Sequence, residues 1–70
     1  MAKIVLREEY ITLGQALKAA GLAESGVEAK LAVQAGEARV NGETDLRRGR
    51  KLYDGDKVLF RGETIEICKS

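Results

Sequence analysis

The stretch TLGQALKAAGLAESGVEAKLAVQAG, residues 12–36, predicts two consecutive helices, because the same capping pattern occurs twice. Thr12 can cap the first helix, and Gln15 three residues later completes a capping box, in which each side chain accepts the backbone N–H of the other residue. Ser25 and Glu28 repeat this spacing at the start of the second helix. Both helix starts are therefore specified by local sequence.

Glycines and apolar residues indicate where these helices end and which faces they bury. Gly21 and Gly36 suit the left-handed backbone position just past a helix end. Only the residues GLAE, 21–24, separate the helices, so the two must be neighbours at a sharp angle. Gly14 lowers helix propensity by roughly 1 kcal/mol relative to alanine, which indicates close packing against another element. Apolar residues recur on one face of each helix, namely Leu13, Ala16, Leu17 and Ala20 in the first and Val27, Leu31, Ala32 and Ala35 in the second.

The second half of the chain predicts antiparallel strands joined by tight turns. Asn41-Gly42 between β-prone residues indicates a type I′ hairpin turn, in which both central residues need positive φ. Arg61-Gly62 marks another turn, and Asp54-Gly55-Asp56 a third. The two aspartates are interpreted as turn formers rather than as an acid pair or metal ligands. The residues expected to face the core are Val40, Val58, Phe60, Ile65 and Ile67.

The order of elements predicts the fold class. Residues 3–13 favour one short strand or two, interrupted by an acidic pair. The chain therefore runs strand, helix, helix and then several strands. This order predicts an α+β fold with two adjacent helices packed on a small, mostly antiparallel twisted sheet. Seventy residues make a single domain, 1–70, with the core motif at about 12–60.

Composition excludes several function classes. Histidine is absent, which removes the commonest general base and metal ligand, so neither an enzyme nor a metal site is expected. Cys68 is the single cysteine and is interpreted as a small apolar residue at a strand end. No apolar run approaches the roughly 20 residues that span a bilayer, and no signal peptide is recognisable. A cytoplasmic monomer without cofactors or membrane contact is expected.

Positive charge gathers in one short loop although the net charge is only +1. Arg47, Arg48, Arg50 and Lys51 follow one another around Gly49, which allows a sharp turn. Arginine suits polyanions because its planar guanidinium binds phosphate in a bidentate manner and stacks on bases. The alternative is a solvated loop whose cations pair with the neighbouring acids, Asp45, Asp54 and Asp56. The residues expected to anchor the loop to the core are Leu46, Leu52 and Tyr53.

Further residues could extend this basic surface. Gly26, Lys30 and Gln34 share a polar stripe of the second helix, where a small residue lets a helix approach a phosphate backbone; an ordinary solvated face is the alternative. Arg39 on the neighbouring strand would widen the patch. Tyr53 could stack on an unpaired base, and the alternative is a tyrosine in the core or at its rim.

Residues 13–60 resemble the RNA-binding domain named after ribosomal small-subunit protein S-four, also called the alpha-L motif. The resemblance covers most of the chain and is greatest to the small stand-alone bacterial members. Each element is weak alone, and the ordered set is fairly specific. The matching elements are Leu17, Gly21-Leu22, Ser25, Gly36, Val40-Asn41-Gly42 and Gly55-Asp56.

The resemblance implies RNA binding through the second helix and the hairpin that follows it. Structured ribosomal or transfer RNA would be the partner, alone or within a ribosome or an assembly intermediate. Many members carry arginine directly after the capping serine; this chain has Gly26 there, so the amides at Ser25 and Gly26 would receive a phosphate instead. The competing hypothesis is a protein-interaction module that pairs an exposed sheet edge with a partner strand.

Overall fold

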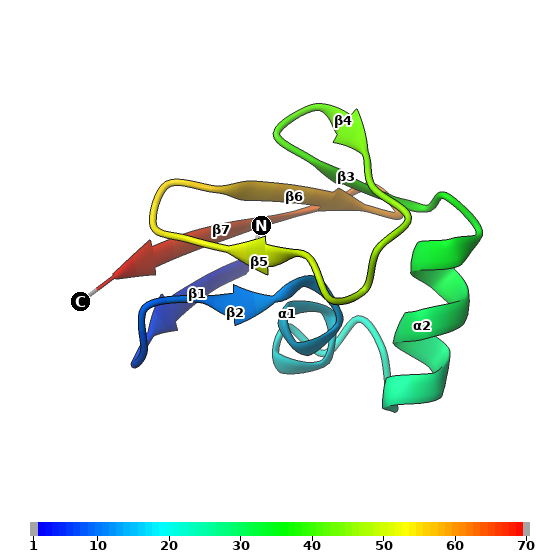
Figure 1. Ribbon diagram of the computed structural model, residues 1–70, viewed down its shortest axis with the longest axis horizontal. Coiled ribbons are helices and arrows are strands. Elements are labelled where there is room, and N and C mark those ends of the chain that lie inside the picture. The colour runs from blue at the N-terminus through cyan, green and yellow to red at the C-terminus, as the bar shows by residue number, and fades with distance from the viewer. Residues whose placement is uncertain (1, 70) are drawn as a thin grey trace.

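The structure is a computed structural model that describes residues 2–69. Two helices follow two short strands, as Figure 1 shows. Their bounds are β1 Ala2–Leu6, β2 Ile11–Thr12, α1 Leu13–Ala19 and α2 Gly26–Gln34. The remaining strands are β3 Ala38–Val40, β4 Glu43–Thr44, β5 Lys51–Leu52, β6 Lys57–Phe60 and β7 Glu63–Lys69.

The strands form one larger sheet and one small ribbon. The sheet has the order β1-β7-β6-β3-β4, and β2 pairs with β5 in a separate antiparallel ribbon. Every pair in the sheet is antiparallel except β1 with β7, which are parallel. The predicted α+β class is therefore confirmed, while the parallel contact between the first and last strands was not predicted.

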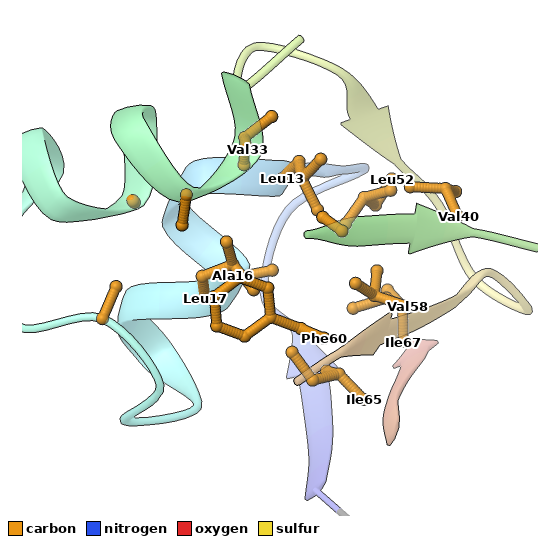
Figure 2. Packing of buried hydrophobic residues seen from close by; sticks show 14 of the residues in the cluster. Leu13, Ala16, Leu17, Val33, Val40, Leu52, Val58, Phe60, Ile65 and Ile67 are labelled. Carbon is orange, nitrogen blue, oxygen red and sulfur yellow. The ribbon is translucent and has the colours of Figure 1, made fainter. Parts of the chain in front are cut away.

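The core lies between the helices and the sheet. Figure 2 shows side chains from α1, α2 and the strands meeting there. Leu13 and Leu17 of α1 are fully buried, as are Val33 of α2 and Leu52 of β5. All five residues predicted to face inward from the strands are at most 1% exposed: Val40, Val58, Phe60, Ile65 and Ile67.

Both predicted hairpin turns are present, and Asn41-Gly42 has the predicted type I′ geometry. Asn41 and Gly42 have φ of 51° and 87°, so both central residues are left-handed, as a type I′ turn requires. Arg61 and Gly62 repeat the pattern at 49° and 80°. Asn41 also bridges to the next turn, because its Nδ2 donates to Asp56 Oδ1 at 3.0 Å.

The helix caps agree with the sequence at α1 and only partly at α2. Thr12 and Gln15 form the full capping box. At α2, Ser25 Oγ accepts the Glu28 backbone N–H at 3.1 Å. The Glu28 carboxylate, however, accepts the N–H of Glu24 at 3.3 Å rather than that of Ser25. The predicted second capping box is therefore wrong in its return bond, which reaches one residue further back.

The buried face of α2 also differs from the prediction. Val27 and Leu31, expected on the apolar face, are 66% and 60% exposed. Ala35 of the predicted face is exposed as well, and Ala32 is the one predicted member that is buried, beside Ala29 and Val33. Alanines allow close approach of α1 and α2, and an alanine-lined face at spacing three and four was available beside the predicted one. The spacing alone could not decide which face meets α1.

Candidate nucleic-acid interface

The basic loop, defined here as residues 45–50, is held against the start of α1. Figure 1 shows the chain descending from β4 to this helix end before it enters β5. Leu13 N–H donates to the Arg50 carbonyl and Gly14 N–H to the Arg48 carbonyl, both at 2.8 Å. The first N–H groups of a helix have no partner within the helix, so the loop backbone satisfies them. These two hydrogen bonds therefore fix the path of the loop backbone over the start of α1.

Gly14 packs closely against the basic loop. A methyl group added at Gly14 would lie 3.5 Å from the Arg48 carbonyl oxygen and 3.6 Å from Arg48 Cβ, which is ordinary van der Waals contact. The close packing inferred for Gly14 is confirmed, and the partner is the basic loop.

Two substitutions at Gly14 should therefore have opposite effects. Gly14→Ala fills available space and restricts the unfolded chain, so the free energy of unfolding should rise by about 0.5 kcal/mol. Gly14→Leu must displace the loop and should lower it by about 1–3 kcal/mol. Urea unfolding measures both. Gly26→Ala, where an added methyl meets nothing within 4 Å, is the control; equal destabilisation by Gly14→Ala and Gly14→Leu would contradict the packing.

Asp45 organises two of the loop arginines. Its carboxylate is 7% exposed and accepts four hydrogen bonds. Arg47 donates its backbone N–H at 2.9 Å, Nε at 3.1 Å and Nη2 at 3.0 Å, and Arg50 donates Nη1 at 2.8 Å. The side-chain hydrogen bonds from Arg47, assisted by Arg50, hold the pKa of Asp45 well below its usual range. The alternative of cations paired with an adjacent acid is thus confirmed for Arg47 and Arg50.

The other two acids beside the loop cap backbone groups. Asp54 Oδ1 accepts the Lys69 N–H at 2.9 Å, and Asp56 Oδ2 accepts the Tyr53 N–H at 2.8 Å. Both are turn formers, as predicted.

The apolar residues expected to anchor the loop differ in burial. Leu52 is buried, as expected. Leu46 is 57% exposed and Tyr53 45% exposed, so the prediction that these two anchor the loop is wrong.

A cleft of about 210 Å³ opens where the loop meets both helices. Its cations are Lys18 and Arg48, and neither makes an ion pair within residues 2–69. Gly26, the first residue of α2, contributes a helix N-terminus, whose N–H groups and dipole favour an anion. The lining residues are Thr12, Gly14, Gln15, Lys18, Gly26, Ala29, Arg48 and Gly49. The cleft therefore offers two unpaired cations and a helix N-terminus to an anionic ligand.

Lys18 was missed by the sequence reasoning. The sequence did contain a signal for a polar face on α1. Gln15 and Lys18 are three residues apart and lie on the face of α1 away from the buried Leu13 and Leu17. Only the docking of the loop beside this face shows that it borders a shared cleft.

The predicted site residues fall into separate groups. Gly26 and Arg48 meet at the cleft, and Lys30 and Gln34 are exposed further along α2. Arg39 alternates with buried Ala38 and Val40, so it points to the sheet face away from the core. The others are Ser25, whose hydroxyl caps α2, the paired Arg47 and Arg50, and Lys51 on the β2–β5 ribbon. Whether each contacts RNA stays a prediction.

No helix within residues 2–69 is long and apolar enough to cross a membrane. Residues 2–69 hold no group of three or more acidic or cysteine side chains placed to bind a metal ion.

Comparison with known proteins gives a consistent result. A family model described as the S4 domain matches residues 4–68. RlbA of Bacillus subtilis (strain 168), named a probable ribosome maturation protein, is 51% identical over 59 residues, which are 84% of this chain and 83% of that protein. The YbcJ protein of Escherichia coli (strain K12) is 31% identical over 61 residues, 87% of each chain.

The fold is also similar to a solved structure. The solution structure of YbcJ from E. coli, described as revealing an alpha-L motif involved in RNA binding, superimposes with a TM-score of 0.74. It covers 97% of this chain and 87% of the YbcJ chain at 32% sequence identity.

Proposed function

Because this chain belongs to the S4 domain family, we propose that it is a non-catalytic module that binds structured RNA, ribosomal or transfer RNA, in the cytoplasm. RlbA is named a probable ribosome maturation protein and YbcJ a putative RNA-binding protein, which supports such a role for this chain. The observation that carries the proposal is the cleft between α1, α2 and the basic loop, where Lys18 and Arg48 lie without acidic partners within residues 2–69.

Phosphate binding at this cleft follows from the chemistry of its lining. Arg48 can bind two phosphate oxygens through its guanidinium, while Lys18 adds a mobile ammonium group. The N-terminus of α2 adds backbone N–H donors at Gly26. Binding of a phosphate by these groups would fix the position of the backbone, as expected for RNA recognised by shape.

The salt dependence of binding should report how many phosphates are engaged. With Arg47 and Arg50 paired to Asp45, the unpaired cations of the cleft and of α2, namely Lys18, Arg48 and Lys30, predict about three phosphates for a hairpin without unpaired bases. The slope of log affinity against log salt should then be about −2 to −2.7, at roughly 0.7–0.9 per phosphate. Fluorescence anisotropy with a labelled RNA hairpin between about 50 and 200 mM salt measures it. A slope indistinguishable from zero would rule out phosphate binding.

A second candidate function is docking of a protein strand on β1. This strand is the end of the sheet, and its Val5 is 53% exposed. An end strand has one row of backbone N–H and C=O groups available to a partner. A protein partner that stays bound after nuclease treatment, and is lost when proline replaces Val5, would favour this function over RNA binding.

A further inference from the structure

The β2–β5 ribbon presents two tyrosines on its outer face. The antiparallel register pairs Ile11 with Leu52 and Thr12 with Lys51. Continuing this register by one residue places Tyr10 opposite Tyr53. Because side chains alternate along a strand, burial of Leu52 turns Tyr10, Tyr53 and Lys51 outward.

These three side chains form a compact exposed group. The tyrosine rings have centroids 5.9 Å apart and are inclined at 51°. Lys51 Nζ lies 4.9 Å from the centre of the Tyr10 ring. Tyr10 is 40% exposed and Tyr53 45% exposed, so neither is a core residue. No carboxylate pairs with Lys51 in the part of the chain that the structure describes.

We propose that the tyrosine pair, Tyr10 and Tyr53, stacks an unpaired nucleobase of the bound RNA while Lys51 binds the phosphate of that nucleotide. The inference rests on the proposed function and names a separate part of the same ligand. Exposed aromatic rings beside a cation are the usual platform for single-stranded bases, since every base has a flat π-face. The inclined rings allow the base to lie on one ring and meet the edge of the other.

Continuity and charge favour a nucleotide over an apolar protein segment. Lys51 follows the basic loop directly, and the Arg48 and Arg50 carbonyls are bonded to α1, so the tyrosine pair and the cleft are held on one framework. Glu9 and Asp54 adjoin the two tyrosines in the chain and would repel further phosphates. The site therefore suits one base with its phosphate at Lys51, such as an overhang or a bulged nucleotide, rather than a continuous duplex.

The chain offers a direct optical test, because Tyr10 and Tyr53 are its two tyrosines and tryptophan is absent. Three RNA hairpins with the same stem are titrated: one blunt, one with a short unpaired overhang, and one whose overhang has the same phosphates but lacks bases. Tyrosine fluorescence should be quenched by the overhang with bases and little by the other two. Affinity for that hairpin should exceed affinity for the abasic one at least about five-fold.

Substitutions at Tyr10 and Tyr53 test whether their rings cause the difference in affinity between the two overhangs. Tyr10→Leu with Tyr53→Leu should remove the difference between the two overhangs, measured with labelled RNA, and leave affinity for the blunt hairpin within about two-fold. Tyr10→Phe with Tyr53→Phe keeps the rings and should keep the difference. If the leucine variant does not fold, the affinities of the unaltered chain for the abasic and the normal overhang still decide whether a base is stacked.

The outcomes separate this inference from the proposed function. Equal affinity for the two overhangs, with unchanged tyrosine fluorescence, overturns base stacking even when the blunt hairpin binds. Failure to bind any of the three hairpins overturns both. If the leucine variant instead loses a protein partner while all RNA affinities stay equal, the tyrosine pair belongs to a protein interface.

Discussion

Lys18→Gln combined with Arg48→Gln is expected to weaken binding of a structured RNA hairpin by about 30- to 140-fold. Each substitution removes one charged hydrogen bond to phosphate, worth about 1–1.5 kcal/mol at a solvent-accessible site, and each 1.4 kcal/mol is a factor of ten in affinity. The salt slope should become shallower by about 1.5, because two phosphate contacts are lost. Both side chains are exposed, so the free energy of unfolding should change by less than about 0.5 kcal/mol.

A charge-matched control distinguishes the cleft from general attraction. Lys3→Gln combined with Lys57→Gln removes the same charge from the outer face of the sheet, where both lysines alternate with inward residues. This variant should bind the hairpin within about three-fold of the unaltered chain, since its charges lie away from the cleft. If both double variants lose affinity equally, the cleft has no special role and the attraction is only that of the net charge.

Asp45→Asn is expected to lower the free energy of unfolding by about 2–3 kcal/mol at pH 7. The amide keeps the size of the side chain but can no longer accept the full set of hydrogen bonds from Arg47 and Arg50. Hydrogen bonds to a buried charged group are worth more than neutral ones, and the estimate is reduced because both guanidiniums can be solvated once released. Urea unfolding at constant m-value measures the loss.

Acid should remove this contribution of Asp45. The folded state holds its pKa below the ordinary value of about 3.9, so the unfolded chain takes up the proton first as pH falls. The stabilisation is therefore complete above about pH 5 and declines progressively below that, as pH approaches the folded pKa. The pKa of exposed Glu37 is likewise lowered by its hydrogen bond with Arg61, so only the difference between the unaltered chain and Asp45→Asn isolates Asp45.

Asp54→Asn is the matched control for Asp45. Asp54 is exposed and accepts one backbone N–H, so its substitution should cost less than about 1 kcal/mol. A stability gap between the unaltered chain and Asp45→Asn that stays constant from pH 7 to 3 would show that the Asp45 carboxylate does not stabilise the fold through its charge.

Much of the fold was predictable because its determinants are local. The capping box at Thr12, the Asn41-Gly42 turn and the alternating pattern of β6 and β7 each act within a few residues, and all three are confirmed. The resemblance noted on residues 13–60 is confirmed too, by the family match over residues 4–68. It rested on an ordered set of turns and caps, which keep their spacing in the chain.

The candidate site was less predictable because its groups come from separate elements. Four cations within residues 47–51 suggested one basic surface. Two of them, Arg47 and Arg50, instead form ion pairs with Asp45, because a buried carboxylate is stabilised by charged donors. Lys18 lines the cleft only because the basic loop packs beside α1. Arg39 faces away because its neighbours on β3 are buried, a consequence of strand register rather than of composition.

By itself the sequence determined the capping box of α1, the turns, strand alternation and family membership of this protein, because these depend on interactions between residues close in the chain. The tertiary structure alone decided which face α2 buries, that β1 joins β7 in parallel, and which cations stay free. These choices arise from packing between distant segments, where the lowest free energy is reached by the whole assembly of helices, loop and sheet. A pattern of charges along the chain cannot reveal which of them the folded molecule neutralises.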